Sequence, residues 1–213
     1  RGPRHRAPAT PGDLLFHVRA RRMDLCFELA RLITESLGAA VTVVDEVHGF
    51  AYFDERDLLG FVDGSENPGG RVAAEATHVG DEDPGFRGGS YVVVQKYLHD
   101  MPAWDALTVE QQERAIGRGK ASNVEMPDDV KPPDSHVALN TIVDEDGTTR
   151  QIFRANMPFG RIGGGEFGTY FIGYARTPAV TAREKSRMRS VLPGGSPRNM
   201  RRSMSSVTAG VRA

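Results

Sequence analysis

The stretch DLLFHVRARRMDLCFELARLITESLGAAVTVVDEVHGFAYF (residues 13–53) changes its hydrophobic period twice. Residues 13–20 and 40–53 are rich in apolar and β-branched side chains, which is typical of strands. Between them, residues 23–38 place leucines and an isoleucine on one helical face and end at a glycine. A strand, a helix and a second strand in this order predict part of a ferredoxin-like unit. We therefore expect an α+β fold with antiparallel sheets flanked by helices.

The composition limits the classes of protein to which the chain can belong. It has 213 residues, of which 39% are hydrophobic and 26% charged, so a packed core is feasible. The formal net charge of −1 gives no general attraction to nucleic acid or to an anionic membrane. No apolar run approaches the roughly 20 residues of a membrane span. The single cysteine, Cys26, cannot form an internal disulfide and suits a reducing compartment, so we expect a cytoplasmic protein with no nucleic-acid or membrane partner.

The remaining chain also predicts strands and helices. Residues 90–98 (SYVVVQKYL) predict a strand, as do residues 169–175 (TYFIGYA). Thr108, with Gln111 three residues later, predicts a helix that begins with a capping box. Residues 136–160 alternate apolar and polar side chains around an Asp-Gly pair, as a β-hairpin does. The Gly- and acid-rich residues 69–89 predict a loop.

Neither of two familiar enzyme motifs indicates a function for this chain. GGGEFG (residues 163–168) matches G-x-G-x-x-G, but it precedes a strand and lacks the helix N-terminus that would hold a pyrophosphate. The strained G-x-S-x-G elbow of many serine hydrolases does not occur in the chain. Neither dinucleotide binding nor serine hydrolysis is therefore indicated.

One carboxylate occupies an unusual position in GFVDGSENP (residues 60–68). Asp63 follows two apolar residues and precedes Gly64. Taken alone, an Asp-Gly pair is most often a surface turn. The alternative is a carboxylate at the mouth of a pocket, where glycine lets the backbone approach a flat ligand. Taken alone, His136 is similarly a solvated loop histidine, Arg154 is a paired surface cation, and His99 is expected to be exposed.

Three separated stretches change these interpretations of single residues, because together they resemble one family. GFVDGSENP, KPPDSHVALN (residues 131–140) and IFRANMPFG (residues 152–160) are similar, nearly letter for letter, to motifs of dye-decolorizing peroxidases, most closely of the B-type branch. The resemblance implies ferredoxin-like repeats of the dimeric α+β barrel type, with haem b (iron protoporphyrin IX) as cofactor. It also implies that hydrogen peroxide oxidises dyes, phenols or other small reducing substrates in one-electron steps. In such a family the intact protein is expected to be a homo-oligomer.

Matched position by position, the resemblance implies roles for individual residues. The implied catalytic residues, on the distal face of the haem, are Asp63, Arg154 and Asn156. The imidazole of His136 is the implied metal ligand, on the proximal side of the iron. The implied cofactor-binding residues are His136, Gly64, Ser65, Thr141, Arg154 and Arg118, the last as a candidate partner of a haem propionate. Glu66 is a rival to Asp63, although its position beside Asn67 and Pro68 favours solvent exposure.

The residue types suit this chemistry. A neutral imidazole supplies the axial nitrogen of a haem iron, and a positioned carboxylate can move a proton between the two peroxide oxygens. The permanent charge of Arg154 can stabilise the negative charge that grows as the O–O bond breaks. Arg154 and Asn156, two residues apart in a strand-like segment, should face the same side. The rival function is a non-enzymatic haem-binding or haem-handling protein, which needs His136 but not Asp63 or Arg154.

The resemblance also divides the chain into three parts. Residues 1–57 are expected to be the remaining part of an N-terminal ferredoxin-like half, because family members have more chain before this stretch. Residues 58–181 are expected to form the C-terminal, haem-binding half. Residues 182–213 are basic and rich in Ser and Gly, and show neither hydrophobic period. We expect them to form a divergent tail.

Overall fold

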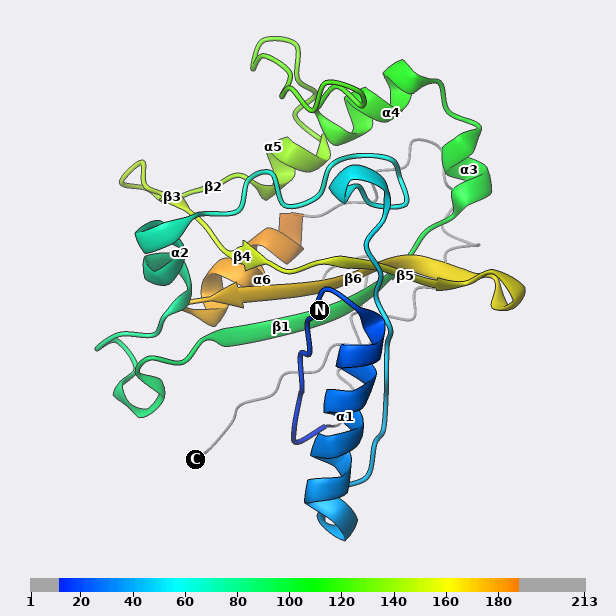
Figure 1. The fold of residues 1–213 in the computed structure, drawn as a ribbon. Coiled ribbons are helices and arrows are strands. Elements are labelled where there is room, and N and C mark those ends of the chain that lie inside the picture. The colour runs from blue at the N-terminus through cyan, green and yellow to red at the C-terminus, as the bar shows by residue number, and fades with distance from the viewer. Residues whose placement is uncertain (1–11, 188–213) are drawn as a thin grey trace.

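The centre of the molecule is a four-stranded antiparallel sheet (Figure 1). The structure, a computed structural model, describes residues 12–187 of the chain. Strand β6 pairs with each of the other three strands, in the order β1-β6-β4, and β5 continues along β6 beyond β4. The strands of this sheet are β1 (Tyr91–Leu98), β4 (Phe153–Arg154), β5 (Met157–Arg161) and β6 (Glu166–Ala175). The expected antiparallel α+β architecture is confirmed.

Helices and a short hairpin surround this sheet. Helices α3, α4 and α5 lie on one side of it, and α1 extends from the other side (Figure 1). The α-helices are α1 (Met23–Leu37), α2 (Gly70–Thr77), α3 (Met101–Asp105), α4 (Val109–Ile116), α5 (His136–Asn140) and α6 (Pro178–Arg187). The 3₁₀ turns are η1 (Gly38–Ala40), η2 (Phe53–Glu55), η3 (Pro84–Phe86) and η4 (Ile162–Gly164). The hairpin pairs β2 (Ile142–Val143) with β3 (Thr149–Arg150). None of the described helices is long and apolar enough to span a membrane.

Several local predictions are confirmed. Strands β1 and β6 form where the apolar runs predicted them, and the β2–β3 hairpin encloses the Asp-Gly pair. At the start of α4, the Thr108 hydroxyl accepts a hydrogen bond from the Gln111 N–H at 3.3 Å, and the Gln111 side chain accepts from the Thr108 N–H at 2.9 Å. This is the capping box that the spacing indicated.

The two faces of the main sheet carry separate apolar clusters. Val94, Ala155 and Ile172 pack on one face. The other face carries Ile152 and Phe171, which pack together with Val180 of α6. Because side chains alternate along an extended chain, Arg154 and Asn156 belong to the face of Ile152 and not to the face of Ala155. The fold therefore presents both residues on the side against which Val180 of α6 packs.

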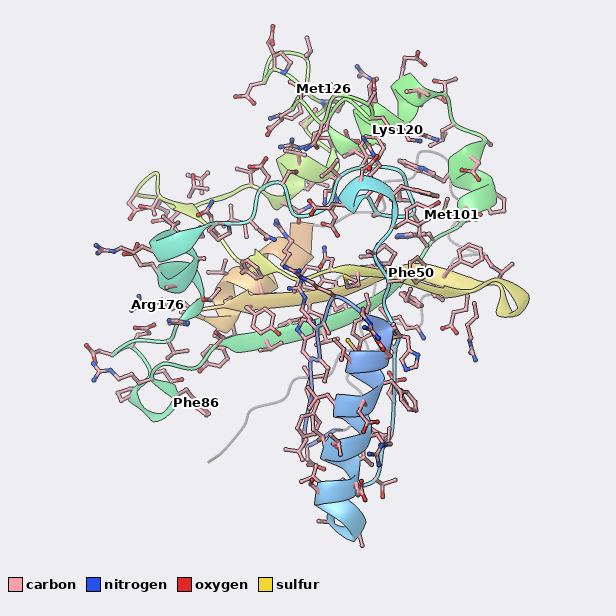
Figure 2. The ribbon with its side chains drawn as sticks, in the orientation of Figure 1. Phe50, Phe86, Met101, Lys120, Met126 and Arg176 are labelled. Atoms are coloured by element: carbon pink, nitrogen blue, oxygen red, sulfur yellow. The ribbon has the colours of Figure 1, made fainter. Side chains whose placement is uncertain are left out.

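The expected strands at residues 13–20 and 40–53 do not form. The second stretch makes only an isolated bridge, in which Gly49 pairs with Phe159 and the Phe50 N–H donates to Pro158 at 3.0 Å. A strand requires a neighbouring strand to take up its hydrogen bonds, and the described residues supply no further neighbour here. The helix between them is confirmed as α1, which ends at Gly38. None of its side chains is buried, and it stands clear of the sheet (Figure 2).

A predicted loop and the start of the predicted hairpin form helices, and helix α6 crosses a predicted boundary. Residues 70–77 form α2, because RVAAEA are good helix formers despite the flanking glycines. Residues 136–140, expected to begin the hairpin of residues 136–160 directly after a loop, instead form α5, with Ser135 as its N-cap. Helix α6 continues beyond residue 181, and residues 188–213 of the expected tail lie outside the described residues.

Candidate active site

The GFVDGSENP stretch is a tight loop anchored at its apolar end. Phe61 is 5% exposed and packs against Trp104 and Ile116. The Asp63 N–H donates to the Glu55 carbonyl at 3.0 Å, which closes the loop around residues 55–63. Gly64 has φ +76°, a left-handed conformation that favours glycine, and turns the chain away from this anchor. The loop therefore directs a half-buried Asp63 toward the sheet.

Asp63 and Asn156 meet, as their shared assignment to one site required. The Asn156 Nδ2 donates a hydrogen bond to Asp63 Oδ1 at 3.2 Å. Asn156 lies between β4 and β5, so the loop and the sheet each contribute one member of the pair. The Asn156 Oδ1 is fully buried and has no hydrogen-bond partner among the described residues. Because a buried acceptor without a hydrogen-bond donor is costly, this atom indicates a place for a ligand or water that donates a hydrogen bond.

Arg154 is held by a residue that the sequence did not single out. The Asn67 Nδ2 donates to the Arg154 carbonyl at 2.7 Å, and the Arg154 N–H donates to Asn67 Oδ1 at 2.8 Å. These bonds join the GFVDGSENP loop to β4 across 87 positions of sequence. The only local signal for such a role is an Asn-Pro pair in a loop, which marks a turn and identifies no distant partner.

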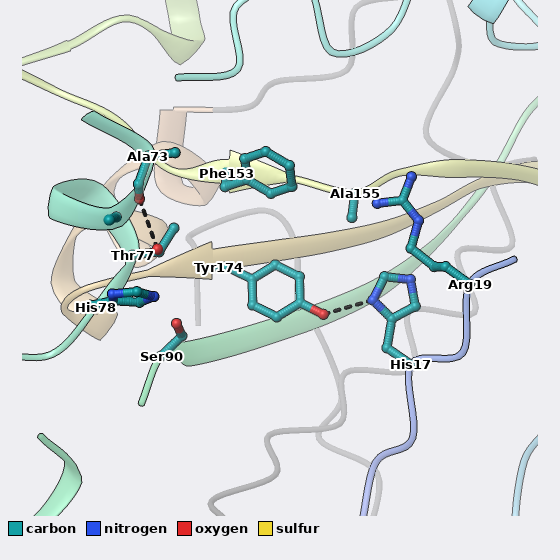
Figure 3. A pocket seen from close by; sticks show the side chains of 10 residues that line it. His17, Arg19, Ala73, Thr77, His78, Ser90, Phe153, Ala155 and Tyr174 are labelled. Carbon is teal, nitrogen blue, oxygen red and sulfur yellow. Dashed lines mark hydrogen bonds between the residues drawn. The ribbon is translucent and has the colours of Figure 1, made fainter. Parts of the chain in front are cut away.

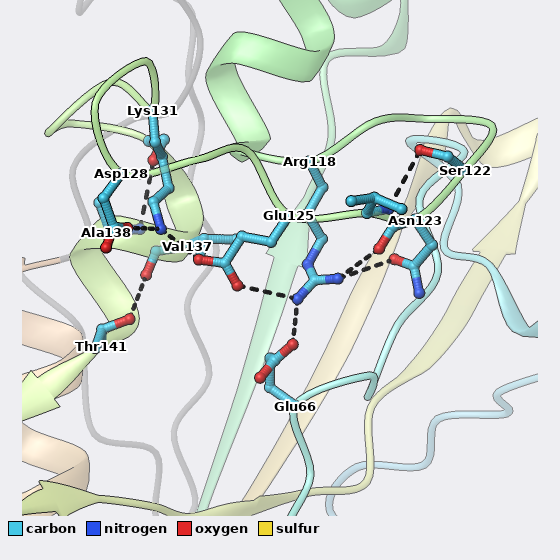
Figure 4. A network of polar contacts seen from close by, with 12 residues as sticks. Glu66, Arg118, Ser122, Asn123, Glu125, Asp128, Lys131, Val137, Ala138 and Thr141 are labelled. Atoms are coloured by element: carbon cyan, nitrogen blue, oxygen red, sulfur yellow. Dashed lines mark hydrogen bonds and ion pairs between the residues drawn. The ribbon is translucent and has the colours of Figure 1, made fainter.

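Arg118 contacts the same loop through Glu66, in an ionic network (Figure 4). It is 8% exposed, and its guanidinium binds the Glu66 carboxylate, the Asn123 carbonyl at 2.6 Å and Glu125 Oε2 at 3.3 Å. Glu66 is exposed, as its position beside Asn67 and Pro68 favoured, and it faces Arg118. A haem propionate at Arg118 would therefore share the guanidinium with two carboxylates.

The network continues to the stretch that contains His136. Lys131 pairs with Glu125 and, at 2.8 Å, with Asp128. Lys131 is the first residue of KPPDSHVALN, so the chain of contacts leads from the Asp63 loop to the His136 segment. Ion pairs of Arg118 and Lys131 thereby connect these two parts of the candidate site.

His136 is half-buried at the first position of α5. The hydroxyl of the buried Ser135 caps the helix by accepting from the Ala138 N–H at 3.4 Å. The Asn140 Nδ2 donates to the His136 carbonyl at 2.7 Å, while its buried Oδ1 has no partner among the described residues. Thr141 is exposed at the end of the helix, where its hydroxyl donates to the Val137 carbonyl at 3.1 Å.

A second carboxylate lies within electrostatic reach of Asp63. Burial raises the pKa of Asp57 to about 6, the N–H of Phe61 opposes this shift by donating to Asp57 Oδ1 at 3.1 Å, and the charge of Asp63 adds to it. The charge of Asp63 therefore disfavours the ionised form of Asp57. Sequence reasoning missed Asp57, because nothing local indicates that a loop aspartate is buried.

A pocket of about 440 Å³ lies on the opposite face of the sheet (Figure 3). Its lining includes Phe153 and Ala155, the neighbours of Arg154, but none of the eight predicted site residues. His17 enters it and shares a hydrogen bond of 2.7 Å with the Tyr174 hydroxyl, and burial lowers the pKa of this histidine. The pocket and the candidate site are thus separated by the sheet.

Comparisons with known proteins agree with the predicted family. Residues 54–211 match the family described as Dyp-type peroxidase, C-terminal, and residues 1–51 match Dyp-type peroxidase, N-terminal. A dye-decolorizing peroxidase of Mycobacterium tuberculosis is 66% identical over 180 residues, covering 84% of this chain and 54% of that protein. The corresponding protein of Mycolicibacterium paratuberculosis is 61% identical over 208 residues, covering 98% of this chain and 58% of the relative. The chain thus spans about half the length of these curated relatives.

Solved structures show the same fold. A variant of DypB from Rhodococcus jostii, in complex with heme, superposes with a TM-score of 0.85 at 64% identity, over 88% of this chain and 61% of that one. The encapsulated DyP-type peroxidase from Mycobacterium smegmatis gives the same TM-score at 60% identity, over 97% and 67% of the two chains. Together with the match over residues 54–211, these similarities establish the relationship. The chain belongs to the Dyp-type peroxidase family, whose ferredoxin-like α+β fold it shares.

Proposed function

We propose that the protein is a haem-dependent peroxidase that uses hydrogen peroxide to oxidise dyes, phenols or other small reducing substrates in one-electron steps. The observation that carries this proposal is the contact between Asp63 and Asn156, which leaves a buried Asn156 oxygen without a donor. A hydrogen-bond donor such as hydrogen peroxide would satisfy that oxygen. The peroxidase names of its relatives support the same reaction.

The residues present fit haem b. His136 would hold the iron through an imidazole nitrogen. Gly64, Ser65 and Thr141 would line the macrocycle, and Arg118 would contact a propionate in competition with Glu66 and Glu125. The haem, when bound, supplies the redox chemistry that divides a two-electron oxidation by peroxide into two one-electron steps. The related DypB variant is described in complex with heme.

The catalytic residues would act on the peroxide. Asp63 would accept a proton from one peroxide oxygen and return it to the other as the O–O bond breaks. Asn156 orients that carboxylate by donating to Oδ1, which keeps the other carboxylate oxygen available for the proton. Arg154 would stabilise the negative charge on the departing oxygen, because its guanidinium stays charged throughout.

The proposed partners are hydrogen peroxide and a small reductant, without nucleic acid or a membrane. We also propose a cytoplasmic location and a homo-oligomeric intact protein. The described helices contain no membrane-spanning candidate. One relative is described as encapsulated, which supports assembly into larger structures for that relative.

The proposal can be tested by reconstitution. The chain is titrated with haemin and then mixed with hydrogen peroxide while its absorption spectrum is followed, and a phenolic dye is added as electron donor. We expect stoichiometric haem binding, a rapid spectral change with peroxide and turnover of the dye. Haem binding with no faster reaction than free haemin would instead favour a non-enzymatic haem-handling protein.

A further inference from the structure

The side chain of Asn67 contacts the backbone of Arg154 and not its guanidinium. The amide makes two hydrogen bonds to one residue, at 2.7 and 2.8 Å, as a neighbouring strand would. The residue is half-buried, so water does not fully replace these bonds. Asn67 therefore acts as a short substitute for a missing strand at the edge of the sheet.

The orientation of β4 explains why this edge needs such a partner. The Ala155 N–H donates to the Ile172 carbonyl of β6 at 2.8 Å. Because successive N–H groups of an extended chain point in opposite directions, the Arg154 N–H points away from β6. Without Asn67, both backbone groups of Arg154 would lose these hydrogen-bond partners.

Asn67 is itself held rigidly. Its N–H donates to the Gly64 carbonyl at 3.0 Å, which closes a turn directly after Asp63. A Cβ atom at position 64 would lie 3.1 Å from Asn67 Nδ2, so the glycine both permits φ +76° and leaves room for the amide. The loop is thus joined to the sheet twice, through Asn67 to Arg154 and through Asp63 to Asn156.

We propose that Asn67 is a positioning residue for the peroxide reaction: it sets the position of Arg154 relative to Asp63 without touching the reacting atoms. The kinetic part of this inference rests on the proposed function. The structural part concerns only the chain and can be tested without turnover. We call the two Asn67–Arg154 hydrogen bonds the clamp. A shift of about 1 Å in a reacting group can lower a rate by roughly a hundredfold, so the loss of the clamp should lower the peroxide rate strongly.

Two variants separate the two hydrogen bonds. Asn67→Ala removes both, whereas Asn67→Asp keeps the acceptor for the Arg154 N–H and removes the donor to its carbonyl. The matched control is Gln112→Ala, because Gln112 is also an amide that binds backbone, donating to the Trp104 carbonyl at 2.9 Å, but it lies in α4. The control loses an amide-to-backbone bond and the bond that Gln112 accepts from Lys120 at 2.6 Å, but Gln112 has no hydrogen bond to any of the eight predicted site residues among the described contacts.

The first measurement is hydrogen–deuterium exchange, read at the Arg154 amide. We expect faster exchange at this amide in Asn67→Ala, near wild-type exchange in Asn67→Asp, and no local change in Gln112→Ala. The second is the rate constant for peroxide in the haem-loaded protein, measured beside the amount of haem retained. We expect rates lower by roughly tenfold to a hundredfold in Asn67→Ala, with haem retention and the Gln112→Ala rate unchanged.

The outcomes distinguish the clamp from the proposed function. Unchanged exchange at Arg154 in Asn67→Ala would overturn the clamp. Faster exchange with a peroxide rate within about twofold of the Gln112→Ala rate would overturn the positioning role. A wild-type chain that binds no haem would overturn the proposed function, and the exchange comparison would still decide whether Asn67 holds Arg154.

Discussion

The carboxylate of Asp63 and the side-chain amide of Asn156 are 3.2 Å apart, although 93 positions separate them in the sequence. The bond uses the donor of the amide and leaves its oxygen buried. An aspartate in a simple surface turn would face water and need no such partner. The contact therefore favours the pocket interpretation of the Asp-Gly pair.

Arg154 should matter more for peroxide activation than for haem retention. Arg154→Leu should bind haem but react with peroxide roughly a hundred- to thousandfold more slowly, a loss of about 2.7–4 kcal/mol in transition-state stabilisation. Stopped-flow absorption measures this rate. The matched control is Arg161→Leu, at the end of β5, because the Arg161 side chain is 83% exposed. Equal rates for the two variants would contradict the assigned role of Arg154.

Asp63 should contribute less than Arg154 to the same step. In Asp63→Ala the proton can still move through water, whereas the other two predicted distal residues, Asp63 and Asn156, carry no positive charge that could replace that of Arg154. We expect a smaller fall in the peroxide rate than in Arg154→Leu, with full haem binding. A parallel Glu66→Gln variant tests the rival carboxylate, and a larger loss in that variant would transfer the acid–base role to Glu66.

His136 should be the iron ligand. His136→Ala should lose most of its haem, or retain haem without a histidine signature in resonance Raman or EPR spectra. His48→Ala is the control, because His48 is an exposed histidine that contacts Glu46. An unchanged ligation spectrum in His136→Ala would exclude the assignment.

Asp57 should make the folded protein less stable as the pH rises. Burial raises its pKa from 3.8 to about 6, so the folded state binds this proton more tightly than the unfolded chain does. The stability that this proton contributes is fully present below 3.8 and is lost as the pH rises to about 6. Asp57→Asn keeps an acceptor for the Phe61 N–H and should gain at most about 3 kcal/mol near neutral pH. Urea unfolding between about pH 4 and 8 measures the difference.

His99 should have the opposite effect over much of the same range. We expected this histidine to be exposed, but its ring is half-buried and contacts the Thr169 hydroxyl at 3.0 Å. Burial lowers its pKa from 6.5 to about 4, so the unfolded chain takes up the proton first as the pH falls. Stability is therefore lost from 6.5 down to about 4.

The two variants should separate these opposing contributions. His99→Gln should flatten the acid side of the stability curve, and Asp57→Asn should flatten the decline toward neutral pH. Slopes that change in the same direction in both variants would show that one of the two groups is not buried as described.

Local patterns predicted the elements whose hydrogen bonds are local or whose partner strand is present. The capping box of α4 depends on two residues three positions apart, and β1 and β6 are apolar runs that pair directly. Residues 40–53 carry an equally strong strand pattern, yet only Gly49 finds a partner, because strand formation depends on a neighbour that the pattern does not specify.

The residues of the candidate site likewise fall into those that local motifs predicted and those that depend on distant contacts. The motifs predicted Asp63, Arg154, Asn156 and His136 as site residues because their residue types and order are distinctive. They could not indicate Asn67, whose proposed role depends on a backbone 87 positions away, or Asp57, whose burial depends on how the whole loop folds. Long-range contacts to the main chain leave little trace in residue type.

The alternation of side chains across β4 makes the site sensitive to strand slippage. A shift of one residue against β6 would turn Arg154 toward the face that holds His17 and Tyr174, and would bring Ala155 to the Asp63 side. Such a slip would preserve most of the sheet while eliminating the arrangement of charges. β4 itself has only two residues, so its register against β6 depends on β5, which continues along β6 in the same register, and on the bonds from Asn67. The loop that carries Asp63 also holds β4, which carries Arg154. A misplaced loop or a shifted strand would therefore displace both side chains together.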